Sequence, residues 1–132
     1  MNGEIVFMSD REKNAKIDMQ KHSGSYNIYK VDATGKNLKQ ITNDPGHEVS
    51  PKFSPDGEWI AYIGRTKEKV ELKLVKRDGS GAKVLATGDD IIDFSWSPDG
   101  KKLSYAQVNG VDSTLAVLDL KSGETEILLK VS

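Results

Sequence analysis

The sequence predicts an all-β chain built from repeated four-stranded units, and three observations support this prediction. A Ser-Pro-Asp-Gly tetrad occurs twice, at residues 54–57 and 97–100, with an offset of 43 residues. Each tetrad lies between two short apolar runs, which is typical of a β-hairpin because Pro, Asp and Gly favour tight-turn backbone angles. No window shows apolar residues at helical spacing. Self-similarity at roughly 40–45 residues indicates stacked sheets.

The first unit is predicted to hold three strands. The apolar run at residues 5–8 matches the second strand of the later units, so the first strand of this unit is missing. Residues 10–25 are mostly polar and are predicted to form a long loop. β-Branched and aromatic residues return at 26–31, and a turn then leads to a short strand at 38–42.

The second and third units are predicted to be complete. Their strands are expected at residues 49–54, 59–63, 71–76 and 83–86, and at 91–97, 102–108, 114–120 and 124–130. The second strand of the second unit is apolar almost throughout and should be buried on both faces, whereas its third strand alternates. A propeller blade requires such a gradient from inside to outside. We therefore predict blades at residues 1–47, 48–89 and 90–132.

Three segments carry a resemblance to a known family. FSPDGEWIAYIG, NIYKVDATGKNLKQITN and WSPDGKKLSYA resemble the TolB-type, WD-like propeller repeat, which is found in TolB and in the propeller domains of prolyl oligopeptidase-like peptidases. The resemblance covers nearly the whole chain and implies a β-propeller. It also implies a periplasmic or other extracytoplasmic location and an envelope protein as partner. The repeated residues are turn and core residues, so they specify the fold rather than the function.

Propellers of this kind usually have six or more blades, whereas this sequence supplies fewer than three complete ones. An open arc exposes two sheet faces and unpaired edges. Two arcs that close one ring would bury about 1,600 Å² or more, a gross gain of about 20 kcal/mol. That gain exceeds an association cost of about 4–15 kcal/mol. We therefore predict a partial propeller of about three blades, which a second copy can complete to six blades as a homodimer. The missing inner strand must come from a partner or from a longer chain.

The composition argues against several classes of function. The chain has 19 Lys and Arg residues against 20 Asp and Glu residues, a net charge of -1, so no global field favours nucleic acid or an anionic membrane. No apolar run reaches the length of a membrane span, and no basic segment precedes a long apolar one, so we expect neither membrane insertion nor a signal peptide. The absence of cysteine excludes disulfides, Cys-ligated zinc and thiol catalysis.

The candidate binding site is a set of loop residues on one face. In a propeller, the connections between successive blades share a face with the loops that join second and third strands. His47 aligns with Asp90 at the 43-residue offset, so both should lie near the channel mouth, where ring-shaped folds often bind ligands. We predict a partner-binding rim, hereafter the loop rim, that consists of His47, Glu48, Arg65, Asp89 and Asp90.

A divalent cation is an alternative ligand for this face. Two histidines and several carboxylates fall on it, namely His22, His47, Asp44, Glu48, Asp89 and Asp90. Their spacing matches no specific metal site, and the D-x-D-x-D-G pattern of a calcium loop is absent. We therefore favour solvated loop residues and predict no metal and no cofactor.

The sequence shows no catalytic motif. Neither a G-x-S-x-G nucleophile elbow nor a G-x-x-x-x-G-K phosphate loop occurs. Asp56 and Asp99 are interpreted as turn residues, and Trp59 and Trp96 as blade core rather than stacking platforms for a sugar or base. The leading hypothesis is a non-enzymatic protein-binding or scaffold module whose loop face or open edge engages another protein or a second copy of the chain.

Two alternatives from the enzyme class stay open. The chain could be part of the propeller that gates a prolyl oligopeptidase-like serine peptidase, in which a separate hydrolase domain cuts the substrate. A longer reading frame with G-x-S-x-G downstream would favour this alternative. A sugar-processing propeller of the oligogalacturonate lyase kind would need a histidine-rich metal site, and the sequence has only two histidines.

Overall fold

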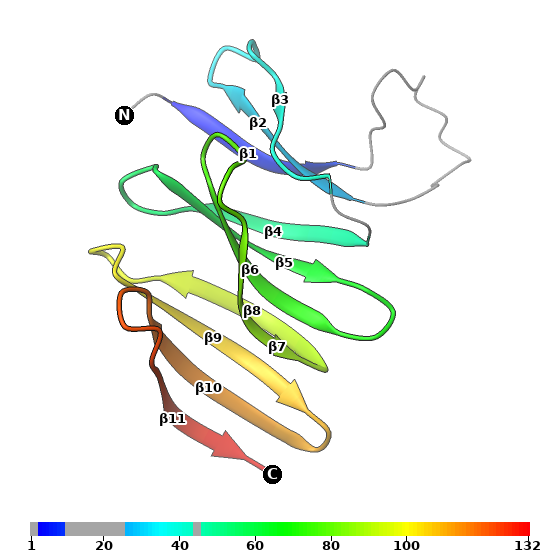
Figure 1. The fold of residues 1–132 in the computed structure, drawn as a ribbon, viewed down its shortest axis with the longest axis vertical. Coiled ribbons are helices and arrows are strands. Elements are labelled where there is room, and N and C mark those ends of the chain that lie inside the picture. Colours follow the sequence, from blue (N-terminus) through cyan, green and yellow to red (C-terminus); the bar gives the residue numbers. More distant parts are fainter. Residues whose placement is uncertain (1–2, 10–25, 44–45) are drawn as a thin grey trace.

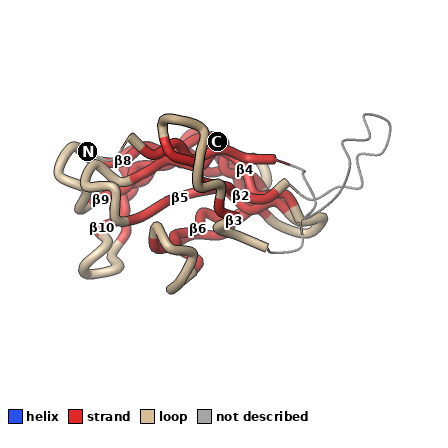
Figure 2. Tube along the Cα trace, turned by 90° about the horizontal axis from the view of Figure 1, so that it is seen from above, coloured by secondary structure: helices blue, strands red, loops and turns tan. Residues whose placement is uncertain are grey.

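The structure is a computed structural model that describes residues 3–9, 26–43 and 46–132. These residues form eleven strands and no helix, and hence no helix that could cross a membrane (Figures 1 and 2). The first sheet contains β1 (Glu4–Ser9), β2 (Asn27–Asp32) and β3 (Lys39–Gln40). The second contains β4 (His47–Phe53), β5 (Trp59–Arg65), β6 (Val70–Lys76) and β7 (Lys83–Gly88). The third contains β8 (Asp90–Trp96), β9 (Lys102–Asn109), β10 (Asp112–Asp119) and β11 (Thr125–Val131).

Each sheet is an antiparallel meander in which strands pair in chain order. The predicted division into three, four and four strands is confirmed. The sheets follow one another along the long axis of the molecule, from the first sheet near the N-terminus to the third near the C-terminus (Figure 1). The long loop predicted at residues 10–25 lies outside the described residues.

The core consists of two clusters, one at each junction between sheets. The junction between the first and second sheets holds Ile28, Ile41, Ile60, Tyr62 and Val75. The junction between the second and third sheets is larger and includes Ala61, Ile63, Leu72, Leu74, Ile91, Phe94, Leu103, Tyr105, Ala116 and Leu118. Because successive strand residues point to opposite faces, β5 contributes to both clusters, as its continuous apolar run predicts.

The third sheet presents an apolar face away from the core. Ala116 and Leu118 of β10 pack in the second junction, so Leu115, which precedes Ala116 in the strand, points to the other side. Leu115 pairs with Leu129 of β11, and these side chains are 40% and 56% exposed. At the 43-residue offset, Leu72 holds the same position in the second sheet and is fully buried. The outer face of the third sheet is therefore equivalent to the face of the second sheet that the third sheet covers.

The first sheet has a corresponding apolar face on its opposite side. Val6 of β1 packs against the first junction, so its neighbours Ile5 and Phe7 point away from it. The rings of Phe7 and Tyr29 stack there with centroids 5.9 Å apart, and Ile5 is 51% exposed. Each end of the stack of sheets therefore carries apolar side chains on the face away from the core.

The two tetrads form the same turn, as predicted. The amide of Gly57 donates to the carbonyl of Ser54, and the amide of Gly100 to that of Ser97, both at 2.9 Å. Both glycines have positive φ, at 75° and 72°, which a side chain would disfavour. In each turn the serine hydroxyl donates to the aspartate carboxylate at 2.6 Å. Asp56 and Asp99 are therefore turn residues, as the sequence indicated.

Replacement of Leu72 tests the second junction. We expect Leu72→Ala to lower the free energy of unfolding by about 2–5 kcal/mol, because this fully buried side chain would leave a cavity. Leu115→Ala is the matched control at the same repeat position, and its 40% exposed side chain should cost less than about 1 kcal/mol. Urea unfolding at low protein concentration, followed by tryptophan fluorescence, measures both. Equal losses would contradict the assigned junction.

The turn aspartates make stability depend on pH. Hydrogen bonds from the Ser54 hydroxyl and the Glu58 amide lower the pKa of Asp56, and those from Ser97 and Lys101 lower the pKa of Asp99. A carboxylate with a lowered folded-state pKa stabilises the fold above its unfolded pKa of about 3.9, and this contribution is lost as pH falls through the folded-state value.

The double variant Asp56→Asn, Asp99→Asn should therefore have a lower Tm than the wild type at pH 7. Its Tm should fall less steeply than that of the wild type between about pH 4 and pH 2, because two groups that titrate on unfolding are gone. Thermal denaturation followed by circular dichroism across this range gives both curves. Parallel curves would show that these carboxylates do not contribute.

Candidate functional site

The loop rim lies at the end of the sheets where β4 and β8 begin and β5 ends. His47 is the ladder partner of Arg65 in the β4–β5 pair. The Nη1 atom of Arg65 lies 2.7 Å from Oδ1 of Asp90, and its Nη2 atom donates to the carbonyl of Ile91 at 3.4 Å. The structure therefore brings His47, Arg65 and Asp90 together, and Arg65 joins the second sheet to the third. The side chains of Arg65 and Asp90 are 39% and 44% exposed, so both are accessible to solvent.

Asp89 lies in the connection between β7 and β8, beside Asp90. Its amide donates to the carbonyl of Val108 at 3.0 Å, and its Oδ2 atom accepts a hydrogen bond from the Gly110 amide at 2.6 Å. Gly110 belongs to the β9–β10 turn. Asp89 therefore fixes this turn next to the β7–β8 connection, and both loops face the same end of the sheets.

Glu48 belongs to the same end of β4, but its side chain is buried. It is 1% exposed, and its Oε1 atom lies 3.6 Å from Nζ of Lys73. A Cβ atom at Gly64 would lie 2.8 Å from Oε2 of Glu48, so the glycine makes room for the carboxylate. Glu48 therefore supports the loop rim from inside the first junction, whereas His47, Arg65 and Asp90 form its surface.

The alternative cation site is only partly described. His22 and Asp44 lie outside the described residues. Within residues 3–9, 26–43 and 46–132, no group of three or more His, Asp or Glu side chains is placed to hold a metal ion. His47 instead contacts Tyr26, with ring centroids 5.4 Å apart, and its Nδ1 atom accepts a hydrogen bond from the Tyr26 amide at 3.4 Å. In the described part of the chain, His47 therefore joins the start of β4 to the residue that precedes β2.

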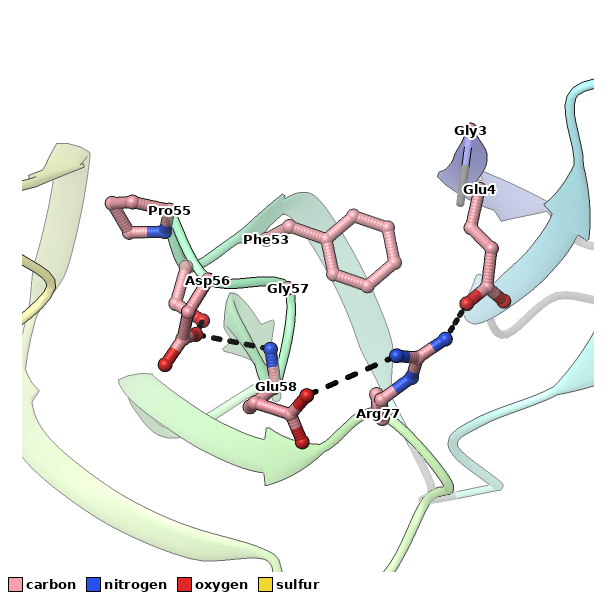
Figure 3. A pocket seen from close by; sticks show the side chains of 9 residues that line it. Gly3, Glu4, Phe53, Pro55, Asp56, Gly57, Glu58 and Arg77 are labelled. Carbon is pink, nitrogen blue, oxygen red and sulfur yellow. Dashed lines mark hydrogen bonds and ion pairs between the residues drawn. The ribbon is translucent and has the colours of Figure 1, made fainter. Parts of the chain in front are cut away.

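A pocket lies at the opposite end of the sheets, between β1 and the turn that joins β4 to β5 (Figure 3). We call it the turn pocket; it has a volume of about 460 Å³, and its lining includes Gly3, Glu4, Phe53, Gly57, Glu58 and Arg77. No pattern in the sequence predicts this pocket. Its residues come from the start of β1 and from residues 53–77 of the second sheet, which are far apart in the chain, and no local motif marks them.

Charged side chains line one side of the turn pocket. Figure 3 shows the guanidinium of Arg77 between the carboxylates of Glu4 and Glu58, and it forms an ion pair with each. Lys30 of β2 lies 3.1 Å from the second oxygen of Glu4 and donates to the carbonyl of Arg77 at 3.1 Å. The first junction is therefore held by ion pairs at this end as well as by the apolar cluster.

Comparison with protein families and curated proteins agrees with this architecture. The family model described as TolB beta propeller domain matches residues 7–132. The Protein TolB homolog of Chlorobaculum tepidum is 33% identical over 95 residues, which cover 71% of this chain and 19% of that protein. Dipeptidyl-peptidase 5 of Porphyromonas gingivalis is 26% identical over 127 residues, which cover 91% of this chain and 18% of that protein. The chain thus spans about a fifth of the length of these curated relatives.

Solved structures show the same fold at lower identity. TolB from Acinetobacter baumannii has a TM-score of 0.73 at 22% identity, with 98% of this chain and 30% of that chain covered. The β-propeller domain of the Trilobed protease from Pyrococcus furiosus, described as having an open velcro topology, has a TM-score of 0.64 at 21% identity, with 80% and 34% covered. The three sheets are therefore adjacent blades of a partial β-propeller, which confirms the predicted fold class.

The buried pair of Glu48 and Lys73 gives a test of the support beneath the loop rim. We expect Lys73→Ala to lower the free energy of unfolding by about 3–5 kcal/mol, because it removes the cation beside a buried carboxylate. Glu48→Gln combined with Lys73→Met should restore most of this loss, since no buried charge remains. Lys69→Ala, which removes a 52% exposed ion-pair partner of Glu71, is the control and should cost at most about 1 kcal/mol. Urea unfolding at pH 7 measures all three, and equal effects of the two alanine variants would contradict this role.

Proposed function

We propose that this chain, which belongs to the TolB β-propeller domain family, is a non-enzymatic binding and scaffold module that pairs with a second copy of itself. The observation that carries this proposal is the match between its two uncovered apolar faces. A blade can bury both faces only against neighbouring blades, so each end of an arc needs another blade to cover it. At each internal junction, a face that looks toward the following blade meets a face that looks toward the preceding blade. The two uncovered faces of the chain are one of each kind.

The first kind of face looks toward the following blade. In the second blade it is formed by Ala61, Ile63, Leu72 and Leu74, which all lie in the second junction. At the 43-residue offset, Leu115 and Val117 of the third blade take the places of Leu72 and Leu74. The exposed Leu115 and its neighbours Ile92, Leu129 and Val131 therefore form a face suited to a following blade.

The second kind of face looks toward the preceding blade and carries an aliphatic residue and an aromatic residue on its second strand. In the second blade these are Ile60 and Tyr62, and in the third they are Leu103 and Tyr105. The first blade presents Ile5 and Phe7 in the same alternation on its outer side. One chain thus offers one uncovered face of each kind, and two copies related by a two-fold axis can cover all four and form six blades.

The loop rim is the surface that we assign to a protein partner. His47, Arg65, Asp89 and Asp90 mix both signs of charge on the face that carries the inter-blade connections. A ring of two copies would repeat these residues around one opening, which favours a polar partner surface over an apolar ligand. Relatives of this chain include the Tol-Pal system protein TolB of Aromatoleum aromaticum, and this supports a protein partner and an extracytoplasmic location.

A peptidase-gating propeller is the second candidate. It is favoured by the similarity to Dipeptidyl-peptidase 5 and to the propeller domain of the Trilobed protease, both of which are named as peptidases. In this role the blades would form part of a filter, and catalysis would reside in a separate domain. Both candidates use the same blade geometry. They differ in what lies against the face around the channel, which is a protein partner in the first and a separate catalytic domain in the second.

Size-exclusion chromatography with light scattering tests the pairing of two copies. We expect a mass of twice 14.5 kDa at about 100 µM protein. Leu115→Arg should shift the protein to the monomer, because it places a charge on the apolar face that the second copy covers. Leu38→Arg is the matched control, since Leu38 is 47% exposed but lies in the β2–β3 connection. A folded wild-type monomer, or equal effects of both variants, would reject pairing and favour cover by further blades.

A further inference from the structure

We propose that the β9–β10 turn modifies itself: Asn109 loses its side-chain amide group through attack by the backbone nitrogen of Gly110, and Asp89 of the loop rim promotes the reaction. Three features point to this site, namely the residue pair, its exposure and two hydrogen bonds that Asp89 makes to the reacting groups. The reaction goes beyond the binding role proposed above and does not depend on the pairing of two copies.

The turn contains a residue pair that is suited to cyclisation. Asn109 and Asp112 are the last ladder partners of β9 and β10, so Gly110 and Val111 form a two-residue turn. Gly110 has a positive φ of 60°, and no described residue other than its chain neighbours lies within 4 Å of the point where a Cβ atom would be. A glycine nitrogen is the least hindered backbone nucleophile, because no side chain shields it. Asn109 and Gly110 are both exposed, so water can reach them.

Asp89 contacts both groups that must react. Its backbone N–H donates to Oδ1 of Asn109 at 3.3 Å, which draws electron density away from the side-chain carbonyl carbon. Its Oδ2 atom accepts a hydrogen bond from the Gly110 amide at 2.6 Å, so a carboxylate lies beside the proton that must leave the nitrogen. This distance is within the reach of a general base, which is about 2.6–3.2 Å. One residue therefore activates both the carbonyl group and the nitrogen that attacks it.

The reaction needs water as its only co-reactant. The nitrogen of Gly110 forms a bond to Cγ of Asn109, and its proton passes to the Asp89 carboxylate and then to the leaving group. The C–N bond of the side-chain amide breaks and releases ammonia. Water then opens the cyclic imide at one of its two carbonyl carbons, which leaves aspartate or isoaspartate at position 109. Asp89 returns to its carboxylate form, and no group is oxidised or reduced.

The product changes the loop rim. A further carboxylate lies beside Asp89 and Asp90, so the loop rim gains one negative charge and becomes more complementary to a basic partner surface. The isoaspartate form also adds a methylene group to the backbone of a two-residue turn that Asp89 holds next to the β7–β8 connection. This consequence rests on the partner role proposed for the loop rim, whereas the reaction itself does not.

Peptide mapping by mass spectrometry measures the reaction in the full chain. The folded protein is incubated at pH 7, and samples taken over time are digested with trypsin. The tryptic peptide of residues 103–121 contains Asn109 and no other asparagine. We expect its mass to increase with time as NH₂ is replaced by OH, and fragmentation should place the change at Asn109. Asp89→Asn should slow the reaction about tenfold or more, because the amide keeps an acceptor beside Gly110 but is not a base. The new amide lies in a different tryptic peptide, so any change there is read separately.

Asp112→Ser is the matched control, because it removes a carboxylate of the same hairpin that pairs with Lys130 rather than with the turn. It should keep the wild-type rate. The isolated peptide of residues 103–121, which lacks Asp89, should react more slowly than the folded chain and gives a second test that does not depend on the folding of a variant. A constant mass at Asn109, an unchanged or faster rate in Asp89→Asn, equal slowing by both variants, or a faster reaction in the isolated peptide would each overturn the proposal.

Discussion

The structure depends on one constraint, which is that a four-stranded sheet with two apolar faces must have a neighbour on each side. β5 shows this most directly, because Ile60 and Tyr62 are buried against the first blade while Ala61 and Ile63 are buried against the third. No single blade can supply both partners for such a strand. The same constraint, applied to the outermost sheets, explains why Leu115 at one end and Ile5 at the other remain exposed in a single chain.

Most of the fold could be predicted from the sequence because local signals and long-range packing agree in this repeat. The Ser-Pro-Asp-Gly tetrads fixed two hairpins, and the alternation of apolar residues fixed which strands lie deepest. The missing inner strand of the first blade was also visible, since residues 5–8 matched a second strand. These features are set by residues within one unit, so one sequence was sufficient to find them.

The functional surfaces were less accessible to such reasoning. The alignment of His47 with Asp90 placed the loop rim at one end of the sheets, but it gave no indication that Glu48 turns inward onto Lys73. That orientation depends on the space above Gly64, which only the packed blades reveal. The turn pocket escaped prediction for the same reason, because Glu4 and Arg77 are distant in the chain and meet only across a junction.

The two junctions also differ in chemistry, although the blades that form them are repeats. The first junction combines its apolar cluster with buried or half-buried charges, including Glu48, Lys73 and Lys30. The position of Lys73 in the third blade, at the 43-residue offset, is occupied by Ala116, which packs in the apolar second junction. A duplicate of the second blade stacked on itself would bury Lys73 against leucines. The charged groups thus make the two junctions chemically different, which disfavours an arrangement in which the order of the blades is changed.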